Sequence, residues 1–301
     1  MIHGGVVAGP VLEGHGLQVI AYKQNGQMLE GGSGSLNADG SFTLTITEYY
    51  TGAILLRVVD TSAQEDYFDE GTGQAKDLTS DLRAVTTLPE PGTYTVNINA
   101  LTELAVRTLG LSGGSDGSSA TTLGSISASD VQAANQQVAS AVGLTQDLVT
   151  GTAPVAVIDT EGVANEAANT YGQLLAAISG AEVSSGSGSS TDAVLEILLE
   201  SLDTTGSSTA LSTAGVEILV RGAAAVADVA PTLVTLVSDL TDKATEVSID
   251  AVAGDNFVSA AEKTAGVTVT GAAAADTALS VRWGESSQSV TANAQGQWNV
   301  T

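Results

Sequence analysis

Residues Val247–Lys263 read V-S-I-D-A-V-A-G-D-N-F-V-S-A-A-E-K, and the chain changes character on either side of them. Before this stretch, apolar residues recur at helical spacing. After it come short runs with the alternation of half-buried strands, at Gly266–Gly271, Ala278–Gly284 and Gln288–Thr301. The stretch therefore predicts a boundary at which helical patterning stops and a β-module of residues 247–301 begins.

Oxygen-bearing side chains are concentrated in the same stretch. Asp250, Asp255, Asn256 and Glu262 lie close together in sequence, and Gly254 stands among them. Hard oxygen ligands without a nearby His or Cys suit Ca²⁺ better than Zn²⁺. Calcium takes roughly six to eight ligands, so backbone carbonyls, water or a neighbouring domain would supply the ligands that these four side chains do not. The alternative is an exposed acidic linker that binds no ion tightly.

The charge balance of the chain limits the kinds of partner that it can bind. Nine Lys and Arg face 34 Asp and Glu in 301 residues, a net charge of -25. Such an excess repels nucleic acid and anionic lipid, so cations are the natural partners. The chain contains no Cys, which excludes disulfides and thiolate metal sites.

Two segments bear on membranes and export. The most apolar window, Ala210–Val237, is interrupted by charged residues and by Pro231, which predicts buried helices and no membrane insertion. The first ten residues, MIHGGVVAGP, lack a basic and an apolar region, so no cleavable signal peptide is expected there.

The first hundred residues alternate strand and turn signals. Strands are predicted at 4–8, 16–24, 27–32, 41–46, 53–60 and 93–98. Asn25-Gly26 predicts a two-residue type I′ hairpin between the second and third of these. An acidic loop, residues 60–81, lies between the last two of these strands. Its composition predicts either a hard-cation site or a solvated loop without an ion. The candidate ligands are Glu65, Asp66, Asp69, Glu70, Asp77 and Asp81.

Helical patterning begins at Asn99, a predicted N-cap. Helices are expected at 100–109, from a Ser129-Asp130 cap to 142, and at 165–179, 192–202, 211–229 and 232–245. Leu101 and Leu104 should pack against the strands, whereas Glu103 and Arg107 are interpreted as a surface pair. The predicted fold class is multidomain β plus α: a β-sandwich at 1–99, a helical bundle at 100–246, and a linker with a partial Ig-like β-sandwich at 247–301.

Two sets of motifs resemble known families. Ile249, Asp250, Val252–Asn256, the strand G-V-T-V-T-G at Gly266–Gly271, and the hairpin N-A-Q-G-Q-W-N-V-T at Asn293–Thr301 resemble the start of one Ig-like repeat of large bacterial surface adhesins, of the biofilm-associated, type I-secreted (RTX) type. A full repeat would run several strands beyond Thr301. Gly4–Val11, Val19–Tyr22 and N-A-D-G-S-F-T-L at Asn37–Leu44 resemble the carboxypeptidase regulatory-like, or transthyretin-like, β-sandwich.

These resemblances imply a non-enzymatic segment of an extracellular adhesin on the bacterial surface, acting in cell attachment and biofilm formation. Calcium would stiffen its domain junction, and its partners would be neighbouring Ig-like domains or subunits and a surface glycan or protein. No P-loop, dinucleotide fingerprint, H-E-x-x-H or G-x-S-x-G motif points to catalysis.

Two alternatives remain open. The first is an extracellular filament assembled by strand donation to the incomplete Ig-like part. The second is a carbohydrate-binding module or enzyme whose site lies between sandwich and bundle, with Tyr49, Tyr50, Tyr67 and Phe68 available for sugar stacking.

Overall fold

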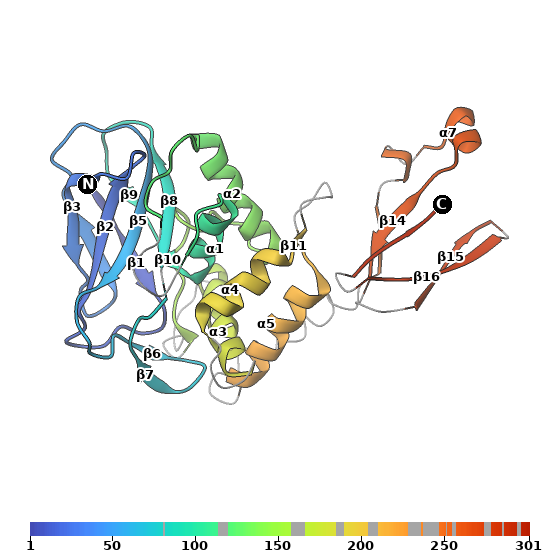
Figure 1. Cartoon of the computed structure of the whole chain (residues 1–301). Helices are drawn as coiled ribbons and strands as arrows, with labels where there is room; N and C mark the ends of the chain where they lie inside the picture. Colours follow the sequence, from blue (N-terminus) through green and yellow to red (C-terminus); the bar gives the residue numbers. More distant parts are fainter. Residues whose placement is uncertain are drawn as a thin grey trace.

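Strands and helices occupy separate runs of the chain, as the sequence predicts (Figure 1). The computed structural model describes residues 1–80, 82–113, 120–157, 166–184, 190–203, 210–227, 236, 247–250, 252–254, 257–273, 278–284, 286–293 and 296–301. Strands come first, helices follow, and a second group of strands forms the C-terminal module.

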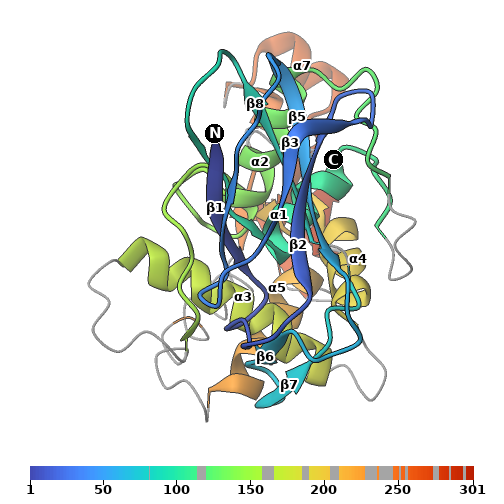
Figure 2. The same cartoon turned by 90° about the vertical axis from the view of Figure 1, so that its left-hand side faces the viewer.

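The N-terminal strands form a unit of two main sheets, here called the β-unit (Figure 2). One sheet has the order β3-β2-β5-β8 and is antiparallel; the other has the order β10-β1-β4, with β9 also paired to β1. A small hairpin, β6-β7, projects from them. The bounds are β1 Ile2–Val7, β2 Leu17–Lys23, β3 Met28–Ser35, β4 Ser41–Leu44, β5 Gly52–Asp60, β6 Tyr67–Asp69, β7 Gln74–Lys76, β8 Arg83–Leu88, β9 Tyr94–Thr95 and β10 Ile98–Asn99.

The hairpin between β2 and β3 is confirmed, but its turn type is not the predicted one. Gly26 has a φ of 81°, whereas Asn25 is not among the residues with positive φ. Gly26 N–H donates to Lys23 O and Lys23 N–H to Gln27 O, at 2.8 and 2.7 Å. These bonds describe a three-residue loop closed by a bulge at glycine, which needs positive φ at one position only.

Strand β5 is apolar throughout because both of its faces are covered. Ile54, Leu56 and Val58 point into the core shared with the other sheet. Ala53 and Leu55 lie on the opposite face, in a second cluster with helical residues. Successive strand residues point to opposite faces, so a strand buried on both sides reads as a continuous apolar run.

The helices begin where their caps lie. They are α1 Ala100–Thr108, α2 Ala128–Ala141, α3 Glu166–Ser184, α4 Thr191–Glu200 and α5 Thr213–Val226. Asn99 caps α1 through its side-chain oxygen, as predicted. The N-cap of α2 is Ser127 and not the predicted Ser129-Asp130. The Ser127 side chain accepts the Asp130 N–H, and the Asp130 side chain accepts the Ser127 N–H, which together form a capping box. The predicted helix 232–245 lies outside the described residues except for Leu236.

One hydrophobic core unites the β-unit and the helices. It extends from Ile2 to Leu236, and Leu101 and Leu104 are fully buried in it, as expected. Helices α3 and α5 cross closely at Gly222, where an added Cβ would stand 1.8 Å from Ala177 O. The short pair β11 Leu202–Asp203 and β12 Ala210–Leu211 joins α4 to α5.

The C-terminal module has its own small core of Val269, Ala273, Ala292, Trp298 and Val300. Its strands are β13 Ser248–Ile249, β14 Val269–Ala272, β15 Ala278–Trp283, β16 Ser286–Thr291 and β17 Gln297–Val300, which form the sheet β13-β14-β17 and the hairpin β15-β16. Helical structure does not stop at the predicted boundary, because the 3-10 turn Val252–Gly254 and helix α7 Ala260–Ala265 lie inside it. Thr213 Oγ1 at the start of α5 donates to Ala273 O at 2.9 Å, a contact between helices and module.

A buried ion-pair network crosses from the β-unit to the helices. Arg83 of β8 donates to both oxygens of Glu103 of α1, at 2.9 and 2.7 Å, and both side chains are fully buried. Arg107 donates to Glu103 at 2.9 Å and pairs with Asp192 of α4. The predicted surface pair of Glu103 and Arg107 is therefore wrong: the spacing is right, but the pair faces the interior because Arg83 lies opposite.

A second ion-pair group joins the β6-β7 hairpin to α3. Lys76 Nζ lies 2.9 Å from Asp69 Oδ2 and 3.4 Å from Glu182 Oε2. Ser179 Oγ of α3 donates to Asp69 and accepts Gly71 N–H. The hairpin is thereby fixed against a helix more than a hundred residues later in the chain.

Removing the C-terminal module should leave the rest folded. Among the described residues, the large core contains none beyond Leu236, and the module's core is separate. We expect a chain ending at Glu246 to melt in one cooperative transition by calorimetry. A molten product without a thermal transition would contradict two separate cores.

Glu103→Gln should destabilise the protein strongly. The substitution leaves the buried Arg83 guanidinium without its counter-charge, which costs about 3 to 5 kcal/mol. Urea unfolding measures the loss. The matched control is Glu196→Gln, which removes a carboxylate 3.8 Å from Arg107 with 62% of its side chain exposed and should change the free energy of unfolding by less than about 0.5 kcal/mol. Equal effects of the two substitutions would contradict the network's role.

Candidate metal centre

The structure describes only part of the predicted junction site. Asp250 directly follows β13, is exposed, and accepts a hydrogen bond from Thr270 Oγ1 at 2.7 Å. Asp255 and Asn256 lie outside the described residues, and for Glu262 only the backbone, within α7, is described. The four ligands predicted for calcium therefore remain a prediction.

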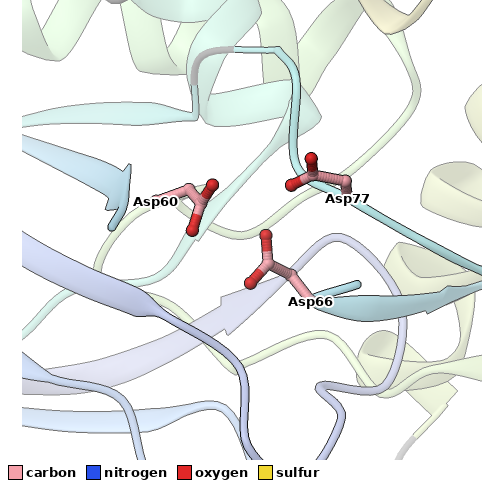
Figure 3. A group of neighbouring side chains, drawn as sticks. All are labelled: Asp60, Asp66 and Asp77. Carbon is pink, nitrogen blue, oxygen red and sulfur yellow. The ribbon is translucent and has the colours of Figure 1, made fainter. Parts of the chain in front are cut away.

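The acidic loop brings three carboxylates together instead. Asp60, Asp66 and Asp77 each place an oxygen so that all three lie within 4.8 Å of one another (Figure 3). They come from three points of the chain: the last residue of β5, the residue before β6, and the residue after β7. Of the other candidates in this loop, Glu65 is exposed, Asp69 belongs to the Lys76 group, and Asp81 lies outside the described residues.

The β6-β7 hairpin creates this convergence. Asp66 N–H donates to Lys76 O at 2.7 Å, which aligns the two ends of the hairpin and brings Asp66 beside Asp77. Asp66 O accepts Leu12 N–H at 2.9 Å, so the hairpin base is also tied to the segment between β1 and β2. Residues far apart in sequence thus meet at one edge of the β-unit.

Asp66 is the anchor of the group. Its side chain is fully buried, and its two oxygens accept the N–H groups of Gly16 and Leu78, at 3.2 and 3.0 Å. Burial raises the pKa of Asp66, the two backbone hydrogen bonds oppose that rise, and the charges of Asp60 and Asp77 add to it.

Within the described part of the chain, no ion pair joins a Lys or Arg side chain to any of these three carboxylates. The ion pairs of Lys23, Lys76, Arg83 and Arg107 all go to other carboxylates. Asp60 accepts Ser62 N–H at 2.8 Å. Like charges at this distance repel, so the group is stabilised by a bound cation or by a proton on Asp66.

The chemistry of the donors selects the class of ion. Three carboxylates without His or Cys fit a hard divalent cation, calcium or magnesium, and not zinc. Water has access to the group because Asp77 is exposed. An open polar hollow of about 430 Å³ lies nearby; Gly16, which donates to Asp66, and Thr61 line it, but none of the three carboxylates does. Water and backbone carbonyls would complete the coordination shell.

The acidic composition of this loop was the only sequence signal for the group. The β-branched residues of R-A-V-T-T-L at Arg83–Leu88 could have revealed β8, for which no strand is predicted. Of the predicted candidates that the structure describes, only Asp66 and Asp77 meet, and Asp60, which was not among them, joins them. This convergence depends on the β6-β7 pairing, which the loop composition does not encode.

Comparison with known proteins adds no relative. No family model, no curated protein and no solved structure matches the chain. Among the residues described, no helix has both the length and the apolar character needed to cross a bilayer. The two family resemblances in the sequence therefore remain expectations.

Proposed function

We propose that this chain is a non-enzymatic segment of a secreted bacterial surface adhesin, acting in cell attachment and biofilm formation, whose β-unit is stabilised by calcium. In this proposal the β-unit is a transthyretin-like sandwich and the C-terminal module is part of an Ig-like repeat. The partners are neighbouring Ig-like domains and a surface glycan or protein outside the cell.

The observation that carries the proposal is the uncompensated group of Asp60, Asp66 and Asp77. Extracellular calcium modules bind with dissociation constants of about 0.1 to 1 mM, so millimolar calcium outside a cell would occupy such a site. Occupation would link the end of β5 to both ends of the β6-β7 hairpin and stiffen that edge.

The remaining architecture suits a structural role. The β-unit and helices share one core and two ion-pair groups, while the C-terminal module stands apart from them in Figure 1. At the boundary between β-unit and helices, the cavity beside Asp69 and Glu182 has a volume of about 30 Å³. That space holds one or two waters, roughly, and not a sugar ring or a substrate.

The aromatic residues considered for sugar stacking differ in how far they are exposed. Tyr49 is exposed, Tyr67 is buried, and the Tyr50 hydroxyl is engaged between Gln24 N–H and Ala53 O. These three side chains therefore do not form one exposed surface on which a sugar could stack, as the carbohydrate-binding alternative would require.

Asp77→Asn tests calcium binding at this group. Calcium should raise the melting temperature of the wild-type chain, since a ligand at ten times its dissociation constant adds about 1.4 kcal/mol to the free energy of unfolding. Asp77 is exposed, so its replacement should leave the calcium-free melting temperature equal or slightly higher and abolish the calcium response. Differential scanning calorimetry with calcium and with EDTA measures both.

Glu65→Gln is the matched control, because Glu65 is an exposed acid of the same loop outside the group. It should keep the full calcium response. If Asp77→Asn responds to calcium as the wild type does, the group is not the site; the Asp250→Ala/Asp255→Ala variant then tests whether the junction binds the ion instead.

A protonation test follows from the raised pKa of Asp66. A carboxyl whose pKa is raised on folding stabilises the fold when it is protonated, and that stability is lost as pH rises through the raised pKa. In EDTA, the melting temperature should therefore fall between acidic and neutral pH, and calcium should remove part of that fall. A calcium response that is the same at both pH values would contradict competition between proton and cation.

A further inference from the structure

The C-terminal module leaves much apolar surface uncovered. Nine large apolar side chains are exposed in the described part of the chain, and four of them belong to this module: Val247, Ile249, Phe257 and Trp283. Only five residues form its buried core. A soluble unit this small gains stability from whatever covers the rest.

Part of this surface is a groove between the two sheets of the module. The groove has a volume of about 320 Å³, and its apolar lining includes Val267, Val269, Val281, Trp283 and Val300. Its lining residues include one charged side chain, Lys263, and no Asp or Glu. In Figure 1 the β15-β16 hairpin diverges from the sheet that contains β14.

Strand edges border this groove. Within the described residues, β15 pairs only with β16, and β17 only with β14. A two-stranded hairpin is marginally stable alone, and a free strand edge accepts an added strand. Trp283, at the end of β15, is 60% exposed, so the inner face of this edge strand lacks a cover.

The same chain contains a segment with the complementary chemistry. Val247–Asp250 is extended at β13, its alternate residues Val247 and Ile249 are exposed, and Asp250 follows with an exposed carboxylate. This segment cannot bind the groove of its own chain. Strand β13 is paired with β14 on the side opposite β17, and none of the segment's residues lines the groove.

We propose that the groove binds the Val247–Asp250 strand of a second copy of this chain. The strand adds to the free edge of β15, Val247 and Ile249 cover Val281 and Trp283, and Asp250 pairs with Lys263. Charge complementarity selects this occupant: an apolar groove with one cation meets an apolar strand with one acid, in a chain of net charge -25. The contact is heterologous, so each added copy presents a new strand and a new groove, and the assembly is an open series.

Apolar burial carries the affinity and the ion pair sets the register. The large net negative charge of each copy opposes association over long range, and salt screens that repulsion while leaving apolar burial intact. Association should therefore strengthen when salt is raised from low to physiological concentration.

Sedimentation velocity over a concentration series is the first test. The wild-type chain should form a series of oligomers, and Trp283→Ser should weaken association at least about tenfold. Tyr49→Ser is the matched control, because Tyr49 is a still more exposed aromatic residue, on the β-unit. A wild type that is monomeric at every concentration, a closed dimer, or equal weakening by both variants would overturn the proposal.

A charge exchange tests the pairing without touching Trp283. Lys263→Glu and Asp250→Lys should each weaken self-association about tenfold, because each places like charges together. A one-to-one mixture of the two variants should recover wild-type association, since the reversed strand now fits the reversed groove. A mixture no stronger than either variant alone would refute this pairing.

The outcome is independent of calcium binding at Asp60, Asp66 and Asp77. Groove and acidic group lie in different modules, and the series is run in calcium and in EDTA because Asp250 is also a predicted ligand of the junction. Oligomers that persist in EDTA would support self-association, and a calcium response of the melting temperature that Asp77→Asn abolishes would support the calcium site. If either proposal fails, the other can still be measured.

Discussion

The buried pair of Arg83 and Glu103 is the interaction on which the arrangement of β-unit and helices depends. Both side chains are withdrawn from water, which is expensive unless the charges meet in good geometry and the remaining donors find acceptors. Here the guanidinium binds both carboxylate oxygens and also donates to the carbonyls of Leu111, Ser112 and Ala120. A strand, a helix and the loop after that helix are thereby held in one relative position. Apolar packing alone tolerates sliding, whereas this bond set does not.

Three of the nine Lys and Arg connect elements of the fold. Arg83 and Lys76 lie where strands meet helices, and Arg107 joins helix α1 to helix α4. Their pairing leaves the acids of the loop at Asp60, Asp66 and Asp77 without a counter-charge among the described residues. We therefore expect a cation from solution, or a proton, to neutralise the buried carboxyl of Asp66. This links the charge balance of the sequence to the proposed calcium dependence.

The two ends of the molecule differ in how completely they bury their strands. The β5 strand is covered on both faces, by the second sheet and by helices. In the C-terminal module, β15 has one strand neighbour among the described residues, and Trp283 is exposed. Because stability rises with the apolar area removed from water, we expect the first end to fold alone and the second to gain stability from a partner strand.

The sequence by itself determined the local elements: the hairpin at Asn25-Gly26, the Asn99 cap of α1, the strand-rich ends and the helical centre. These depend on turn chemistry, capping and periodicity over a few residues. Tertiary structure alone decided whether Glu103 and Arg107 face water or Arg83, because their spacing of four is the same in both cases. It likewise decided which acids of the loop meet, since Asp60, Asp66 and Asp77 converge only after β6 pairs with β7. Local pattern fixes which face a side chain takes within its element, but the charge opposite that face comes from a distant segment.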